Sequence, residues 1–378
     1  MYICDKSVVQ MSIISTKYKR IFFKILPFGI IWLLLGLLFL WIEYASINTS
    51  INQEISKAAI YITPKIVLFA SISIFCIGCF VGFLEVRLIN KFFFKKSFPS
   101  KLIAKFIIYV VLLNLLTFVF YLLAASIEMQ KSVFSLAVFE RYKLFFFSIT
   151  NISTSIQLAF SMLVSLLYAE ISDNLGQNVL LNFFIGKYHK PVVENRTFMF
   201  TDMKDSTRIA ETMGNVKYFN FLRSYYNDLS ESILNYNGEV YQYIGDEIVI
   251  SWQNKNANSE AQSVDCFFDM KKKLSEKKDK YLKEYKVFPE FKAAIHKGEV
   301  TVGEIGALKK EIFFTGDVLN TTARIQNLCN EFKMDLLVSD LIAKNLDSNR
   351  FVLKRMDNIV LKGKSNTINI VGVQKERK

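Results

Sequence analysis

Two aspartates in the second half of the chain stand where a metal-dependent phosphate reaction would need them. Residues 197–201 (TFMFT) predict a short buried strand, and Asp202 follows it directly. Residues 238–252 contain two strand-like runs around Gly245 and Asp246, which predict a β-hairpin. If this hairpin lies beside the first strand, the two carboxylates converge, and a hard divalent cation relieves their repulsion. We therefore expect both aspartates to bind metal.

The residues after Asp202 predict a phosphate site at the start of a helix. An amphipathic stretch typical of helix runs from there to about Asn235. Backbone N–H groups at a helix N-terminus can receive phosphate oxygens, and the helix dipole favours their charge. One of the polar residues here is expected to act only as the N-cap, either Asp205 or Ser206. The expected phosphate-binding residues are Met203, Lys204, Asp205, Ser206 and Thr207.

A third segment carries an amide and a guanidinium at helical spacing. Residues 311–315 predict a strand, and a helical pattern follows Gly316. Asn320 and Arg324 are four residues apart, so they share one face of a helix. An arginine there can stabilise charge on a transferring phosphoryl group, and an asparagine can orient a ribose. By itself such a pair is more often a solvated helix face, so its meaning depends on the other segments.

Three segments in this order, MFTDMKDST, VYQYIGDEIV and FTGDVLNTTARIQ, together resemble the class III adenylyl/guanylyl cyclase catalytic domain. The resemblance covers about residues 195–373. It implies a ferredoxin-like, palm-like α/β (α+β) sandwich whose active sites form at a head-to-tail dimer interface. It also implies two ions of Mg²⁺ or Mn²⁺ per active site, held by the two aspartates.

The resemblance assigns roles to residues beyond the metal ligands. Asn320 and Arg324 match the transition-state pair that the opposite subunit supplies. Lys362 matches a late lysine that contacts the triphosphate, and Lys364 is the nearby alternative. Because one chain carries both halves of the site, a homodimer would make two equivalent sites.

The positions that recognise the base depart from the family pattern. Adenylyl cyclases usually have Lys at the position of Gln242 and Asp or Thr at that of Phe313, whereas guanylyl cyclases tend to have Glu and a small residue such as Cys. Gln242 can donate and accept hydrogen bonds, and Phe313 can only stack or pack. Analogy with bacterial members favours ATP as the substrate, and GTP is the alternative.

The first half of the chain reads as a membrane domain. The chain is 52% hydrophobic and 21% charged, with the apolar residues concentrated in the first half. Each of four apolar segments has roughly the twenty residues that a hydrocarbon core requires. They are residues 25–44, 66–86, 103–125 and 145–168. The expected fold is therefore an N-terminal four-helix transmembrane bundle followed by the cyclase domain.

The basic residues predict the orientation and the partners of the chain. Lysines and arginines precede the first span and surround the second connection. This pattern predicts a multi-pass protein of the inner or plasma membrane, with the N-terminus and the catalytic domain in the cytoplasm. The chain has a net charge of +13 but no basic block with interleaved aromatic residues. We therefore expect a lipid bilayer, and not nucleic acid, as the partner of its basic residues. Gly78 and Gly82 form a G-x-x-x-G, either a packing face or a chance pattern.

The expected domains are a membrane domain (1–169), a linker (170–194) and a catalytic domain (195–378). In the linker, Val179, Leu180, Phe183 and Phe184 would share one face of a short helix that Gly186 could end. The bundle would bind an unknown ligand or protein, or only anchor and dimerise the chain.

Together these features predict a membrane-anchored adenylate cyclase, a phosphorus–oxygen lyase that converts ATP to cyclic AMP and pyrophosphate as a homodimer. The alternatives are a guanylyl cyclase and a catalytically weak, nucleotide-binding regulator. His296, expected at a strand end before a turn, should have a structural or surface role rather than a catalytic one.

Overall fold

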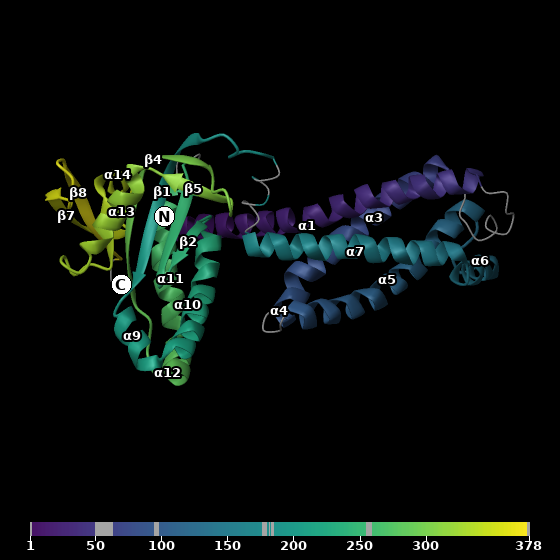
Figure 1. The fold of residues 1–378 in the computed structure, drawn as a ribbon, viewed down its shortest axis with the longest axis horizontal. Helices are drawn as coiled ribbons and strands as arrows, with labels where there is room; N and C mark the ends of the chain where they lie inside the picture. Colours follow the sequence, from purple (N-terminus) through teal and green to yellow (C-terminus); the bar gives the residue numbers. More distant parts are fainter. Residues whose placement is uncertain are drawn as a thin grey trace. The chain divides into compact units, whose positions relative to one another are not determined.

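A computed structural model describes most of the chain, and its described residues form two compact units (Figure 1). One unit comprises residues 18–181, and the other comprises the remaining residues, most of them from residue 182 onward. The described residues are 2–49, 63–93, 98–175, 180, 182, 185–254 and 259–375.

The first unit is helical. Its elements are α1 (Tyr2–Thr49, which begins in the other unit), α3 (Pro64–Leu84), the π-helical turn η1 (Glu85–Ile89), α4 (Asn90–Phe93), α5 (Phe98–Met129), α6 (Leu136–Phe146) and α7 (Ile149–Leu175). Among the described residues, four helical segments are long and apolar enough to cross a membrane. They are Ile21–Ala45, Pro64–Ile89, Ile103–Met129 and Asn151–Asp173, so the four predicted spans are present.

The fourth span begins later than the sequence pattern predicted. The predicted span 145–168 crosses a break between α6 and α7 at Phe147 and Ser148. The Ser148 hydroxyl donates to the Phe145 carbonyl (2.6 Å) and accepts from the Asn151 backbone N–H (3.3 Å). A serine that satisfies both helix ends in this way favours two helices over one, although the hydropathy is continuous. The Asn151 side chain bonds the Phe146 carbonyl (2.9 Å) at the end of α6.

The G-x-x-x-G segment is a packing face. A Cβ at Gly78 would lie 2.7 Å from the Trp32 Cβ and 2.9 Å from the Phe28 carbonyl oxygen, and one at Gly82 would lie 2.8 Å from the Phe28 ring. Trp32 also donates its indole N–H to the Ser165 hydroxyl (2.9 Å). The absence of side chains at the two glycines therefore lets α1 and α3 approach closely, as small residues do in membrane helices.

Ion pairs join the helices at one end of this unit. Glu85 in η1 binds the buried Lys105 and accepts a hydrogen bond from the Tyr109 hydroxyl (2.8 Å). Lys101 pairs with Glu170 (3.0 Å), which connects α5 to α7. Buried charges are stable only when paired in this way, so these contacts fix the helices to one another.

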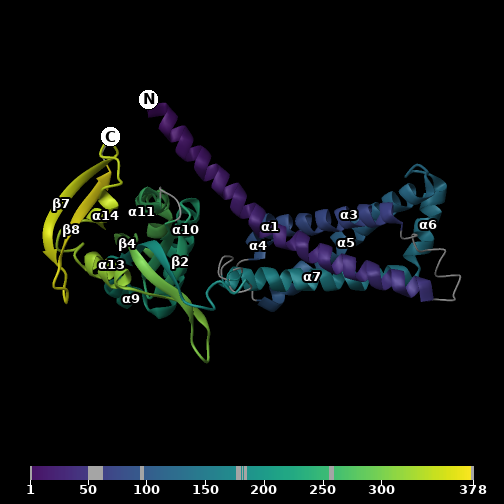
Figure 2. The same cartoon turned by 90° about the horizontal axis from the view of Figure 1, so that it is seen from above.

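The second unit is built on one mixed sheet. In chain order, its elements are β1 (Val192–Met203), α9 (Ser206–Met213), α10 (Asn215–Asn235), β2 (Glu239–Ile244), β3 (Glu247–Gln253), α11 (Ser259–Glu276), α12 (Lys278–Tyr285), β4 (Phe291–Ile305), β5 (Glu311–Thr315), α13 (Asp317–Asn327), β6 (Leu336–Ser339), α14 (Asp340–Ala343), β7 (Phe351–Val360) and β8 (Thr367–Lys375). Among the described residues the strand order is β2-β3-β1-β4-β6-β8-β7, with β5 paired to β4. Figure 2 shows β7 and β8 at one edge.

Strands β1 to β4 lie in the sheet in the order β2-β3-β1-β4, which is the order of a ferredoxin-like β-α-β-β-α-β unit, as expected. Strand β1 is longer than the predicted 197–201, because its pairing with β4 extends from Val192 to Met203. Alternate residues of β1 face two different cores. Met199 and Met203 pack with α10 and α11, whereas Phe198 and Phe200 pack with β5 and the start of α13. Asp202 shares the second face by the strand period of two.

Of the predicted linker helix, Val179, Phe183 and Phe184 lie outside the described residues. Gly186 has φ 64° and lies in a turn, in which the Lys187 N–H bonds the Asn182 carbonyl (3.0 Å).

Candidate active site

Strand pairing brings the two predicted metal-binding aspartates together. Thr201 of β1 pairs with Ile248 of β3, so Asp202 lies next to the β2–β3 turn that contains Asp246. The backbone N–H of Met203 donates to the Asp246 carboxylate at 3.2 Å. Burial raises the pKa of Asp202, and the neighbouring Asp246 carboxylate raises it further. The two side chains therefore form a crowded acidic pair that a cation would stabilise.

A lysine that the sequence patterns did not single out already lies against this pair. Lys292 of β4 is opposite Asp202 in the strand register, and its ammonium is 3.2 Å from the Asp202 carboxylate. This ion pair opposes the rise in the Asp202 pKa but does not cancel it. Lys292 also donates to the Asn330 side chain at 3.3 Å, which gives it a second place to bind if a metal ion displaced it.

Glu247 adds a third carboxylate beside the pair. Its pKa is raised to about 7, first by burial and then by the charges of Asp202 and Asp246. Three carboxylates therefore share this corner of the sheet. The sequence offered a signal, since Glu247 follows Asp246 in the hairpin, but only the fold shows that its side chain shares the aspartates' environment.

The donor set fits a divalent ion bound together with a substrate. Within the described residues, no group of three or more His, Cys, Asp or Glu side chains converges into a complete metal cage. Mg²⁺ is usually held by one or two carboxylates, with substrate phosphates and water as its other ligands. The Asp202–Asp246 pair would supply the protein's share of such a site.

Helix α9 begins next to this acidic pair and has a free N-terminus. Asp205 is its N-cap residue, with a left-handed φ of 55° and no side-chain bond to the helix amides. Its carboxylate instead lies 3.5 Å from Arg208. The N–H groups of Ser206 and Thr207 therefore stay available for an anion such as phosphate. The Lys204 ammonium donates a hydrogen bond to the Asp335 carboxylate (2.6 Å). This ion pair would have to break before Lys204 could make its predicted contact with phosphate.

The predicted Asn320 and Arg324 lie on one helix, as their spacing indicated. Both are in α13, where Asn320 is exposed and Arg324 is half-buried. A Cβ placed on Gly363 would be 3.5 Å from the Arg324 guanidinium, so this side chain lies against the turn between β7 and β8.

The two candidate lysines of that turn differ in their surroundings. Lys364 donates to Asp317 and to Thr321, each at 2.5 Å, which ties the turn to the first half of α13. This contact is the main reason that the pKa of Asp317 is lowered. Lys362 is exposed. Of the two, Lys362 is the side chain available to a triphosphate.

The acidic pair and the β7–β8 turn are at different levels of the sheet. Asp202 is level with Lys292 at the start of β4, whereas β8 enters the sheet level with His296, through Ile370 and Ser339. This offset is roughly 13 Å along the strands and roughly 14 Å across three strand spacings. Within one chain, the β7–β8 turn against which the Arg324 side chain lies is therefore offset from Asp202 and Asp246.

Residues 188–372 match the family model described as the adenylate and guanylate cyclase catalytic domain. This part of the chain is a class III cyclase catalytic domain. The match includes both aspartates, the free end of α9, helix α13 and the β7–β8 turn, so the family covers every part of the candidate site.

Similar proteins share this domain. Adenylate cyclase 2 of Rhizobium meliloti (strain 1021) is 33% identical over 182 residues, which are 48% of this chain and 50% of that protein. The adenylate cyclase of Anabaena cylindrica is 25% identical over 248 residues, or 60% of this chain and 47% of that protein. The chain thus spans about half the length of these curated relatives. The crystal structure of the adenylyl cyclase CyaB from P. aeruginosa aligns with a TM-score of 0.45 and 18% identity, covering 50% of this chain and 98% of that one.

The predicted base-recognition residues of the cyclase domain are both exposed. Gln242 lies on the edge strand β2, just after a register shift, and Phe313 lies on β5 with 44% of its surface exposed. Their neighbours point inward: Tyr241 packs against Phe314 with ring centroids 4.6 Å apart and accepts its backbone N–H (3.3 Å). This contact connects β2 to β5 and leaves Gln242 and Phe313 at the surface of the domain.

His296 is structural, as expected, although not at a strand end. It lies within β4, is 9% exposed, and its Nδ1 is 2.8 Å from the Ser339 hydroxyl. Burial lowers its pKa to about 4, and the nearby Lys364 contributes. The imidazole is therefore neutral at physiological pH and acts as a hydrogen-bonding group of the core.

Proposed function

We propose that this protein is a membrane-anchored adenylate cyclase that converts ATP to cyclic AMP and pyrophosphate at sites shared by two copies of the chain. The observation that carries the proposal is the division of the site. Asp202 and Asp246 lie near the start of β4, and the turn that contacts Arg324 follows from β8, which joins the sheet further along and three strands away from β1. Two chains in a head-to-tail arrangement would complete two equivalent sites. The similar proteins named adenylate cyclase support ATP as the substrate.

The reaction is an internal displacement at the α-phosphorus. The ribose 3′-oxygen forms a bond to that phosphorus, the bond to the oxygen bridging to the β-phosphate breaks, and pyrophosphate leaves. The 3′-hydroxyl proton passes to solvent. Mg²⁺ or Mn²⁺ bound with the substrate would favour loss of this proton and neutralise phosphate charge.

The chain's own residues would position and stabilise the reacting groups. Asp202 and Asp246 would hold the cations, and the free amides at the start of α9 would bind phosphate oxygens. From the other chain, Arg324 would stabilise the charge that develops on the α-phosphoryl group, and Asn320 would orient the ribose. Lys362 would contact the triphosphate, while Lys364 holds the β7–β8 turn on α13.

The charge distribution supports a cytoplasmic catalytic domain. Basic residues lie before the first span and around the connection between the second and third, as in cytoplasmic loops. Four crossings then return the chain to the same side, where nucleoside triphosphates are available.

Measurement of the product tests the proposal. The purified full chain in detergent is supplied separately with ATP and GTP, each with Mg²⁺ and with Mn²⁺. Cyclic AMP that disappears in Asp246→Asn is the expected result. Cyclic GMP as the main product would identify a guanylyl cyclase, an alternative that the exposed Gln242 and Phe313 keep open because neither family pair is present. Neither product from folded, dimeric protein would favour a nucleotide-binding regulator.

A further inference from the structure

The helical unit (residues 18–181) contains a partly open cavity that the cyclase reaction does not use. Its volume is about 230 Å³, and residues of α1, α3, α5, α6 and α7 line it. Most of the lining is aliphatic or aromatic, as in sites for small organic molecules. An apolar cavity of about 150 Å³ is large enough to bind benzene in another protein, so this one has room for a ring with a substituent.

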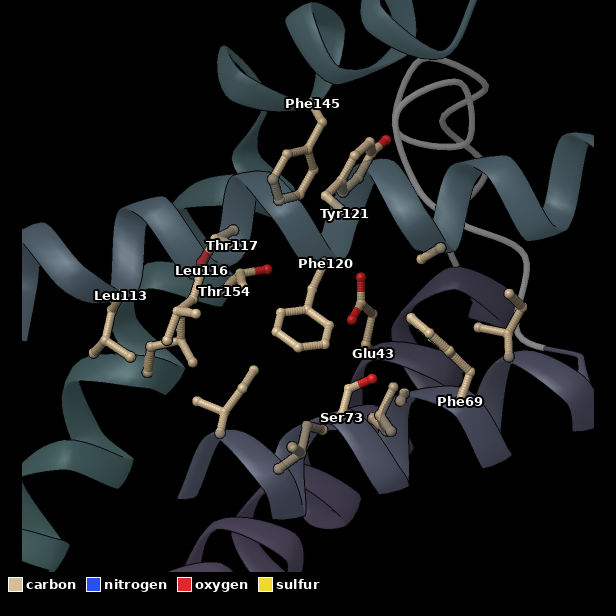
Figure 3. A pocket seen from close by; sticks show the side chains of 17 residues that line it. Glu43, Phe69, Ser73, Leu113, Leu116, Thr117, Phe120, Tyr121, Phe145 and Thr154 are labelled. Carbon is tan, nitrogen blue, oxygen red and sulfur yellow. The ribbon is translucent and has the colours of Figure 1, made fainter. Parts of the chain in front are cut away.

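A single carboxylate faces this apolar space. Figure 3 shows the Glu43 side chain directed into the cavity between Phe69 and Phe120, with the Ser73 hydroxyl nearby. Glu43 belongs to the candidate span Ile21–Ala45. Within the described residues, no cationic side chain or hydrogen-bond donor pairs with it. The bundle's other carboxylates at helix contacts are different, since Glu85, for example, is paired with Lys105.

Aromatic rings surround the carboxylate. Phe69 and Phe120 have centroids 6.5 Å apart, and Tyr121 and Phe145 stack at 4.1 Å on another wall. The faces of aromatic rings carry partial negative charge and attract cations, and rings of this kind form the recognition sites for organic ammonium groups. The carboxylate and the rings therefore select the same sign of charge.

We propose that this cavity is a binding site for a small organic ammonium ion with an apolar body. The ammonium group would pair with Glu43 and contact the faces of Phe69 and Phe120, and the apolar body would fill the aliphatic part near Leu113 and Leu158. An anion would be repelled by Glu43, and a neutral apolar molecule would leave the carboxylate without a partner in a poorly solvated site.

Binding of matched probes to the full chain tests this proposal. The protein is purified in a maltoside detergent, which has no ammonium group, and titrated calorimetrically with phenyltrimethylammonium. Its uncharged carbon isostere, tert-butylbenzene, has the same shape. The cation is expected to bind with one site per chain, at least about tenfold more tightly than the isostere after subtraction of protein-free micelles. The assay requires no turnover, so its result is independent of the cyclase proposal.

Three variants locate the site. Glu43→Gln keeps the shape of the side chain and is expected to weaken cation binding about tenfold. Ala70→Leu fills the cavity and is expected to abolish binding of both probes. Glu140→Gln is the control, because Glu140 is an exposed carboxylate of α6 outside the cavity lining, and it should bind like the original protein.

Equal binding of the two probes, or unchanged cation binding in Glu43→Gln, would overturn the proposal. Absence of cation binding to the unmodified chain would overturn it as well. Size-exclusion chromatography and helical circular dichroism establish that each variant is folded. If Glu43→Gln does not fold, Phe120→Leu replaces it: loss of affinity for the cation but not for the isostere supports the site, and equal losses reject it.

Discussion

At the scale of single residues, the central feature of the site is the Asp202 carboxylate, for which Lys292 and a divalent ion would be alternative partners. Lys292 pairs with it, burial raises its pKa, and the neighbouring Asp246 carboxylate raises that pKa further. A divalent ion would offer Asp202 a stronger partner, and Lys292 already has a second contact at Asn330. The same corner contains Glu247, so its negative potential does not depend on one side chain.

We expect Asp246→Asn and Asp202→Asn each to lower kcat by roughly a hundredfold or more, because a neutral amide cannot hold a divalent ion as firmly. Folding should be retained, since the change removes repulsion between neighbouring carboxylates. Steady-state kinetics and thermal unfolding of the full chain measure the two effects. Asp279→Asn, an exposed position on α12, is the matched control. Activity of Asp246→Asn within tenfold of the control would contradict the assignment.

The lowered pKa of His296 predicts that the stability of the folded chain depends on pH. Its pKa is about 4 in the folded chain and 6.5 without the fold, so the unfolded state binds more protons between these values. The stabilising effect of the neutral imidazole is therefore complete above pH 6.5 and is lost as the pH falls toward 4, by up to about 3 kcal/mol. Hydrogen exchange of β4 in the full chain at pH 7 and pH 5, corrected for intrinsic rates, measures this change.

His296→Asn should remove most of this pH dependence while keeping a side chain that can bond Ser339. The same drop in protection in the variant and in the original chain would show that another group is responsible.

At the scale of elements, the close approach of α1 and α3 depends on the glycines of α3. A side chain at Gly78 would collide with the Phe28 backbone carbonyl as well as with Trp32, and backbone cannot move aside as a flexible side chain can. The Trp32 hydrogen bond to Ser165 extends this contact to α7. Three helices thus share one packing point.

We expect Gly78→Leu to lower the thermal unfolding midpoint of the detergent-solubilised chain by several degrees, because overpacking costs about 1–3 kcal/mol. Cys76→Leu is the control, since Cys76 is exposed on the same helix. Equal midpoints for the two variants would show that the α1–α3 contact adjusts without cost.

At the scale of the whole molecule, the proposed division of the site would make activity a property of a pair of chains. An Asp202→Asn chain and an Arg324→Ala chain should each be inactive alone. A mixed dimer of the two would contain one intact site and one doubly damaged site. Mixed dimers isolated with two affinity tags should therefore show roughly half of the original activity.

The control pair combines Asp202→Asn with Asp246→Asn on separate chains. Both residues belong to the same half of the site, so no mixed dimer contains an intact site and no recovery is expected. Recovery in this control, or none in verified mixed dimers of the first pair, would argue against a shared site.

Much of this protein was determined by local sequence patterns. Four long apolar segments indicated the membrane helices, and a strand and a hairpin were recognised next to Asp202 and Asp246, whose convergence still depended on the two elements lying side by side. The i, i+4 spacing of Asn320 and Arg324 predicted their common helix face, which α13 confirms. These inferences succeed because hydrophobic period, turn residues and helical spacing act over a few neighbouring residues.

Tertiary structure decided the features that depend on residues far apart in the chain. Strand register placed Lys292 on Asp202 and buried His296 against Ser339, and the packing of the β7–β8 turn on α13 placed Lys364 on Asp317. A hydrogen-bonding serine, not hydropathy, set the start of the fourth span. The cavity around Glu43 is formed by five helices, and no single helix carries its pattern. Cross-strand register and helix packing are set by the folded core, so a linear pattern cannot specify these contacts.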